Sequence, residues 1–156
     1  MEKCCWTGFA VEVKTGVANL NLDTETLDLS VCVNETVLQT MEVTLGGTNS
    51  TTLSITWNTG DYVKGRYAVR AYVLPVSGET EIDDNSLIGG WVLVTIVGDV
   101  NEDFRVNILD TIMIARSDGS NEGGLVYNPV CDTNSDWRTD LLAIVIAVGN
   151  YRRADS

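Results

Sequence analysis

The sequence predicts a multidomain fold: an all-β sandwich over residues 1–97, followed by a small α-helical domain over residues 98–156. From Phe9 to Ile96, apolar and polar residues alternate in short runs, the pattern of half-buried strands. After Gly98 the alternation stops, and apolar residues occur in compact blocks between acidic loops. The 156 residues are 44% apolar, which is enough to form the cores of two small domains.

The clearest strand of the first domain is residues 52–57, where Leu53, Ile55 and Trp57 alternate with serine and threonine. Similar runs predict strands over residues 10–13, 27–33, 37–45, 67–74 and 91–97. Turn residues separate them, and six or seven short strands at this spacing are typical of a two-sheet sandwich. The alternation places Trp57 in the core, which disfavours a sugar-binding role for this side chain.

Composition excludes several classes of function. The net charge is −12 and the basic residues do not cluster, so we expect no nucleic-acid partner. The chain has no histidine, which excludes Ser-His-Asp and Cys-His catalysis and histidine-ligated metals. The longest strongly apolar run, residues 141–148, is far shorter than the roughly 20 residues that cross a bilayer, so we expect no membrane span.

The cysteines and the N-terminus carry less information. Cys4, Cys5, Cys32 and Cys131 contain no C-x-x-C spacing, so no zinc ribbon is expected. Adjacent cysteines rarely bridge each other, so a disulfide would involve Cys32 or Cys131, and buried free thiols are favoured. Residues 1–10 lack the apolar core of a signal peptide, so we expect either a cytosolic chain or a mature or truncated piece.

The second domain contains an internal repeat. The segments GDVNEDFRVNILDTIMIA and CDTNSDWRTDLLAIVIAV align without a gap at an offset of 33 residues, from Asp99 to Asp132. Each copy has the pattern D-x-N-x-D followed by an apolar block of helix size, the first over residues 111–116. The sequence therefore predicts two copies of one loop-and-helix unit.

The spacing D-x-N-x-D lets oxygen side chains on alternate residues converge on one hard cation, for which calcium is the natural candidate. The expected ligands of the first copy are Asp99, Asn101, Asp103, Asn107 and Asp110 through side chains and Arg105 through its carbonyl. Three carboxylates this close repel one another, so binding should also order the loop. The alternative is a solvated polar turn, and the repetition favours calcium.

The second copy is less complete. Its expected ligands are Asp132, Asn134, Asp136, Asp140 and the Arg138 carbonyl. Ala143 stands where the first copy has Asp110, so this site should be weaker, and both binding and loss of binding stay open. Phe104 and Trp137 replace the usual position-6 glycine, where a left-handed backbone costs roughly 1–2 kcal/mol. We interpret both aromatic rings as covering the apolar interior of the helix pair.

The segment GDVNEDFRVNILDTIMIARSDGS, followed by YNPVCDTNSDWRTDLLAIVIAVGNY, closely resembles a dockerin domain over about residues 98–151. The resemblance implies a duplicated calcium loop with helix and the ligands named above. It also implies that loop positions 10 and 11 contact a cohesin partner. These positions are Ile108, Leu109, Leu141 and Leu142. A cohesin-like domain, or a neighbouring domain of a surface protein, is the partner that the resemblance predicts.

The segment VTLGGTNSTTLSITWNTGDYVKGRYAVRAYVLPVSGETEIDDNSL is similar to the CARDB type of immunoglobulin-like adhesion domain. A Ser/Thr-rich turn before the strand ending in Trp57, residues 64–67 and the acidic turn 79–85 carry this similarity. The two resemblances together imply a fragment of a secreted or cell-surface protein. Glycosylation acceptor triplets at Asn34 and Asn49 agree with that location, as do weak calcium loops that fill only outside cells.

Three functions follow, none of them enzymatic. The first is a calcium-organised attachment module with the sandwich as a spacer, the second a calcium-rigidified stalk without a partner, and the third a sugar-binding module. The aliphatic pairs discriminate between the first two, because exposed pairs would form a docking surface and inward-facing pairs would be core. No carboxylate pair outside the repeated loops suggests acid–base catalysis.

Overall fold

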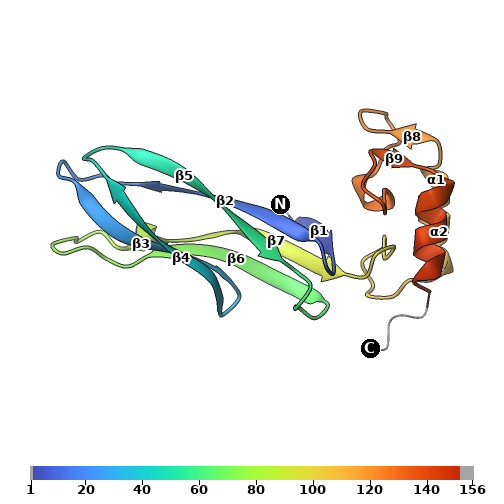
Figure 1. Ribbon diagram of the computed structural model, residues 1–156, viewed down its shortest axis with the longest axis horizontal. Helices are drawn as coiled ribbons and strands as arrows, with labels where there is room; N and C mark the ends of the chain where they lie inside the picture. The colour runs from blue at the N-terminus through green and yellow to red at the C-terminus, as the bar shows by residue number, and fades with distance from the viewer. Residues whose placement is uncertain (1, 152–156) are drawn as a thin grey trace. The chain divides into compact units, whose positions relative to one another are not determined.

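The computed structural model describes residues 2–151, which form two compact units (Figure 1). The first unit is built mainly from residues 8–59 and 66–92. Among the described residues, the second contains 4–7, 60–65 and 93–151. The first unit is almost entirely β, whereas the second holds both α-helices.

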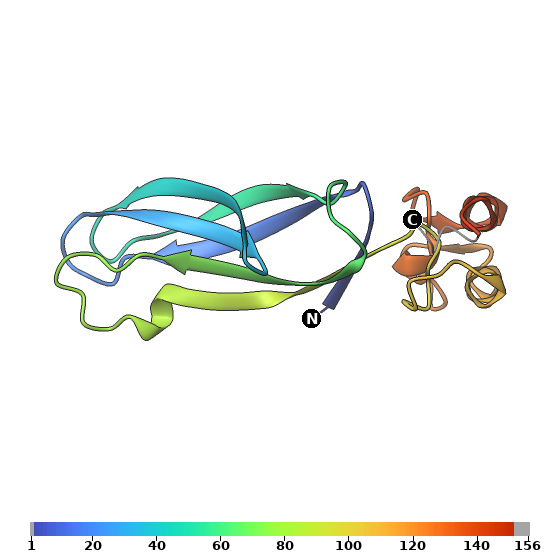
Figure 2. The same ribbon diagram turned by 90° about the horizontal axis from the view of Figure 1, so that it is seen from below.

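Seven strands make up the β-rich part of the chain. They are β1 (Glu2–Trp6), β2 (Ala10–Ala18), β3 (Glu25–Val33), β4 (Thr36–Leu45), β5 (Ser50–Asn58), β6 (Gly65–Val73) and β7 (Ser86–Thr95). One sheet has the order β1-β7-β6-β3-β4, and β2 pairs with β5 in the other (Figures 1 and 2). All six expected strands are confirmed, several of them longer than the sequence predicted. Strand β1 was not predicted.

The core of this part forms from the inward face of the alternating strands. Val11, Ile55 and Trp57 are at most 3% exposed on the β2–β5 pair, and Leu29, Val31 and Val33 of β3 are buried to the same degree in the larger sheet. The Trp57 and Tyr67 rings meet edge to face with centroids 5.6 Å apart, and so join β5 to β6 of the larger sheet. The predicted burial of Trp57 is therefore confirmed.

Two exposed asparagines with glycosylation patterns lie in turns, as expected. Asn34 follows β3 with a left-handed backbone, φ 50°, and its side-chain oxygen accepts a hydrogen bond of 2.9 Å from the Ala68 N–H. Asn49 lies before β5. Both acceptor side chains are accessible. Cys32 and Cys131 are buried free thiols, Cys5 is also buried, and the side chain of Cys4 lies outside the part that the structure describes.

The second unit contains helices α1 (Ile108–Arg116) and α2 (Leu141–Gly149), which pack side by side (Figure 2). A short ladder, β8 (Ser120–Asn121) with β9 (Arg138–Thr139), and the 3-10 turn Pro129–Cys131 connect them. Another 3-10 turn, Asp83–Asn85, belongs to the first unit. None of the helices among residues 2–151 is long and apolar enough to cross a membrane.

Small residues let the helices approach closely. Ala143 and Ala147 of α2 are fully buried beside Ile114 of α1. Gly98 has φ +95°, and a Cβ added there would lie 2.7 Å from the Ala147 Cα. Glycine is therefore required at position 98 both by the backbone conformation and by the packing of α2.

Candidate metal-binding loops

The first loop, residues 99–110, is organised around the buried carboxylate of Asp99. Its Oδ1 accepts a hydrogen bond from the Asp103 N–H at 3.1 Å, and its Oδ2 accepts one from the Phe104 N–H at 3.0 Å. The Thr95 hydroxyl also donates to Oδ2. Burial raises the pKa of Asp99, and the nearby charge of Asp110 acts in the same direction. The first and last acidic residues of the loop are thus close enough to interact.

Asp110 closes the loop from its other end. This fully buried carboxylate accepts backbone N–H groups of Val100 at 2.9 Å and Asn101 at 3.2 Å through Oδ1, and of Asn107 at 2.8 Å through Oδ2. The Asn107 side chain in turn accepts from the Leu109 N–H at 2.8 Å, which completes a capping box. Helix α1 therefore begins at Ile108, three residues before the expected start.

The remaining expected ligands of the first loop lie nearer the solvent. Asp103 is exposed, and its Oδ1 accepts from the Arg105 N–H at 2.9 Å. The Asn101 amide donates to the other Asp103 oxygen at 3.0 Å. The loop thus has a buried half, with Asp99 and Asp110, and an accessible half that includes Asp103.

The second loop, residues 132–143, repeats this arrangement. Asp132 accepts from the Asp136 N–H at 3.2 Å and the Trp137 N–H at 2.8 Å. Asp136 accepts from the Arg138 N–H at 3.0 Å, and Asp140 caps α2 by accepting from the Leu142 N–H at 2.8 Å. The sequence repeat is therefore also a repeat of hydrogen bonds.

The loops differ at position 12, where Ala143 replaces the carboxylate. The buried Thr133 hydroxyl closes the second loop instead, by donating to the Ala143 carbonyl at 3.0 Å. This closure needs no charge. Asp140 stands where the first loop has Asn107, so each loop still contains three carboxylates among its expected ligands.

The backbone is left-handed at the same two positions of both loops. The φ values are 63° at Glu102, 65° at Phe104, 58° at Ser135 and 69° at Trp137. The expected conformation at position 6 is thus present without glycine. The predicted role of the rings is wrong for Trp137, which is 62% exposed. The backbone N–H of Trp137 donates to Asp132. The small buried residues of the two helices fill the interior without the Trp137 ring.

Within residues 2–151, no three acidic or cysteine side chains gather into one preformed metal cluster. The structure offers instead carboxylate, amide and carbonyl oxygens along each loop, the ligand type that calcium prefers. Hydrogen bonds to the loop N–H groups do not exhaust the lone pairs of these carboxylates. In the second loop, the Asn134 side-chain oxygen is buried without a hydrogen-bond partner. An oxygen left unsatisfied at position 3 fits a cation ligand.

Two hydroxyl groups near the loops were not predicted from the sequence. Thr95 bonds to Asp99, and the Tyr127 hydroxyl donates to Asp132 Oδ2 at 3.0 Å. Desolvation, this hydrogen bond and the carboxylate charge raise the pKa of Tyr127 to about 12. Thr95 lies four residues before Asp99, whereas Tyr127 lies five residues before Asp132. No common spacing in the sequence could therefore have identified these two hydroxyl groups.

The aliphatic pairs at positions 10 and 11 face outward. Ile108 is 60% exposed, Leu109 56%, Leu141 70% and Leu142 50%. Four further apolar residues of the same helices, Ile112, Met113, Val145 and Val148, are also exposed. We call these eight residues the helix surface. Position 10 and 11 side chains are thus surface rather than core.

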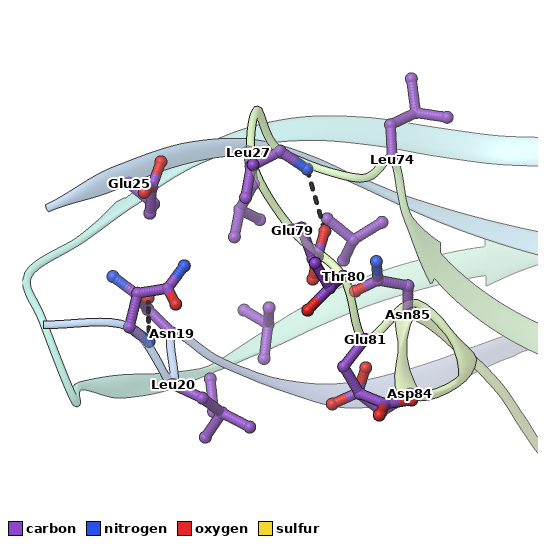
Figure 3. Close-up of a pocket in the computed structure, with 16 residues that line it drawn as sticks. Asn19, Leu20, Glu25, Leu27, Leu74, Glu79, Thr80, Glu81, Asp84 and Asn85 are labelled. Atoms are coloured by element: carbon purple, nitrogen blue, oxygen red, sulfur yellow. Dashed lines mark hydrogen bonds between the residues drawn. The ribbon is translucent and has the colours of Figure 1, made fainter. Parts of the chain in front are cut away.

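A separate pocket lies in the first unit (Figure 3), with a volume of about 210 Å³. Glu79, Glu81 and Asp84 line it together with Leu27 and Leu74. Glu79 accepts the Val76 N–H at 2.9 Å and so shapes the acidic turn. Glu81 and Asp84 are exposed, as expected of a solvated turn.

Comparisons with known proteins bear mainly on the β-rich part. No protein-family model matches the chain, and neither does any curated protein. The chain is similar to the crystal structure of a CARDB domain from Pyrococcus furiosus in complex with di-metal ions, with 20% identity and a TM-score of 0.50. The match covers 60% of this chain and 86% of that one. The NMR structure of that CARDB domain gives 21% identity, a TM-score of 0.49 and coverage of 59% and 85%.

A third similar structure is a type II cohesin–X-dockerin complex from Acetivibrio cellulolyticus, an interface mutant. It has 14% identity and a TM-score of 0.32, with 88% of this chain and 95% of that one covered. This likeness is too weak to assign a fold. The CARDB match, in contrast, establishes the fold of the larger part: the β-rich region has a CARDB-like immunoglobulin fold, followed by two short helices.

Proposed function

We propose that this chain is a non-catalytic, calcium-dependent attachment module of a secreted or cell-surface protein. The two loop-helix repeats act as a dockerin-like unit that binds a cohesin-like protein domain, and the CARDB-like domain is a spacer. The observation that carries the proposal is the exposure of the helix surface, which includes positions 10 and 11 of both loops. The exposed Asn34 and Asn49 side chains support an extracellular location.

Helix α2 makes the strongest case for a protein partner. Its sequence, LLAIVIAVG, contains no polar side chain, and a helix that is apolar on all sides is normally buried. Here only Ala143 and Ala147 are buried, whereas Leu141, Leu142 and Val145 are at least 50% exposed. A contiguous exposed apolar area of this kind is typical of a binding surface.

The loops connect calcium to that surface. Asp110 accepts a hydrogen bond from the Asn107 N–H, and Asp140 accepts one from the Leu142 N–H. These bonds determine where α1 and α2 begin. When bound, calcium would supply a divalent charge that offsets the carboxylates. Asp99, Asn101, Asp103, Arg105, Asn107 and Asp110 would hold it in the first loop. In the second loop, Asp132, Asn134, Asp136, Arg138 and Asp140 would do so, and the unsatisfied Asn134 oxygen supports binding there.

Capture by a panel of purified cohesin domains tests this proposal. We expect capture in millimolar calcium, little in EDTA, and loss with Leu109→Asp or Leu142→Asp. The matched control is Leu74→Asp, which places the same charge at a leucine that is 61% exposed in the first unit. Equal capture of all three variants would contradict a docking role for the helix surface. Calcium-dependent stabilisation without any capture would favour the stalk function instead.

A further inference from the structure

The position-1 aspartates of both loops have the same hydrogen-bond environment. In each, Oδ2 accepts two hydrogen bonds: one from the position-6 N–H, and one from a hydroxyl that precedes the loop. Thr95, the last residue of β7, provides the hydroxyl for Asp99. Tyr127, in the segment between the repeats, provides it for Asp132 at 3.0 Å.

The two oxygens of each aspartate are therefore not equivalent. A carboxylate oxygen has about two lone pairs, so two donors occupy Oδ2 fully. Oδ1 accepts a single bond, from the Asp103 N–H at 3.1 Å in the first loop and the Asp136 N–H at 3.2 Å in the second. One lone pair of Oδ1 thus stays available in each loop.

We propose that Thr95 and Tyr127 are positioning residues for the cations, each holding a position-1 carboxylate so that its Oδ1 faces the metal. This inference rests on the proposed calcium binding of the loops. Two unrelated side chains, one at the end of β7 and one in the irregular segment between the repeats, donate to the same oxygen of equivalent aspartates. A common role toward the loop explains this convergence better than local packing does.

The burial of the aspartates gives the hydroxyls their importance. Asp99 is 0% and Asp132 4% exposed, so water is poorly placed to replace a lost donor. Without the hydroxyl, only the two backbone N–H groups orient each carboxylate, and Oδ2 gains a free lone pair that competes with Oδ1 for the cation. Groups that orient a metal ligand typically change metal affinity by about 10–100-fold when they are removed.

Calcium affinity, measured loop by loop, tests the inference. In ¹⁵N NMR titrations of the full chain, the Phe104 and Trp137 amides report the first and second loop, because each donates to its position-1 carboxylate. We expect Thr95→Val to weaken binding about tenfold or more in the first loop only. Tyr127→Phe should do the same in the second loop only, and Thr95→Ser should stay within about twofold of wild type.

Matched controls exist in the same unit. Thr139 is fully buried and its hydroxyl has no partner, so Thr139→Val removes a hydroxyl without removing a hydrogen bond. The Tyr151 hydroxyl bonds to the Thr111 hydroxyl at 2.7 Å, so Tyr151→Phe removes a tyrosine hydroxyl whose bond is to a threonine and not to a position-1 aspartate. Neither control should change calcium affinity by more than about twofold.

The outcomes separate this inference from the function on which it rests. A wild-type chain that binds no calcium would remove the proposed function itself. If the wild type binds calcium and neither Thr95→Val nor Tyr127→Phe changes the affinity, the positioning role alone is overturned. If one loop of the wild type binds no ion, the positioning role of the hydroxyl beside that loop is likewise overturned. Because Thr95 is fully buried, its valine variant is first checked by thermal unfolding in EDTA. If that variant does not fold, Tyr127→Phe at its partly exposed site decides.

Discussion

Replacing Asp110 by alanine tests whether the first loop is held by its own hydrogen bonds. The buried carboxylate accepts three backbone N–H groups, and a hydrogen bond to a charged group is worth about 1.5–3 kcal/mol. Two effects oppose the loss: water can reach part of the opened loop, and the repulsion of Asp99 disappears. We therefore expect a net loss of about 3 kcal/mol in EDTA.

The assay is thermal unfolding of the full chain in EDTA, followed by circular dichroism at 222 nm, which reports mainly α1 and α2. For a unit of 60–100 residues, about 3 kcal/mol corresponds to a decrease in Tm of about 12–24 °C. The control is Asp103→Ala, which removes one carboxylate from the same loop at an exposed position. It should lower the Tm by no more than a few degrees.

Equal decreases in Tm for the two variants would refute the reasoning, because both remove one negative charge and only Asp110 is buried. An increase in Tm for Asp110→Ala would show that charge repulsion, rather than hydrogen bonding, dominates the loop without calcium.

Three further predictions concern the second unit. Gly98→Ala should cost about 2–4 kcal/mol in thermal unfolding, because the new Cβ meets Ala147 and φ is positive, whereas Gly149→Ala, with nothing within 4 Å, should not destabilise α2. Thr133→Val should cost about 1–2 kcal/mol in urea unfolding, because it removes the bond that closes the second loop. Burial raises the pKa of Cys131 above 9.0, so its contribution to stability is complete below pH 9 and is lost as pH rises through the folded-state pKa. Iodoacetamide at pH 9, with site-resolved mass spectrometry, should modify this cysteine far more slowly in folded than in unfolded protein.

Alternation predicted the strands wherever one face of a strand is buried. It found β5 because Ile55 and Trp57 are buried at a two-residue period. It missed β1, since the segment Glu2–Trp6 places Cys4, Cys5 and Trp6 in succession and shows no alternation. Strand β2 continues to Ala18, beyond the expected Val13, because pairing with β5 and not a clean apolar pattern extends it.

The loops were more predictable than their surroundings. The repeat predicted the left-handed backbone at Phe104 and Trp137, and the structure adds that the two loops share the hydrogen bonds of their first aspartates. The same spacing says nothing about the hydroxyls of Thr95 and Tyr127, which reach the loops from outside the repeat. The exposure of Trp137 was also unpredictable from residue type, because a large aromatic residue in a small domain is normally assigned to the core.

The absence of charge on α2 has a consequence for how the chain behaves at high concentration. Copies that each carry a net charge of −12 repel one another over a distance set by the ionic strength, about 10 Å at 0.1 M salt. That repulsion opposes association of the exposed leucines and valines of α2 with those of another copy. Concentrated salt shortens the range of this repulsion. We therefore expect the chain to self-associate through α2 at high salt, and light scattering would detect the association.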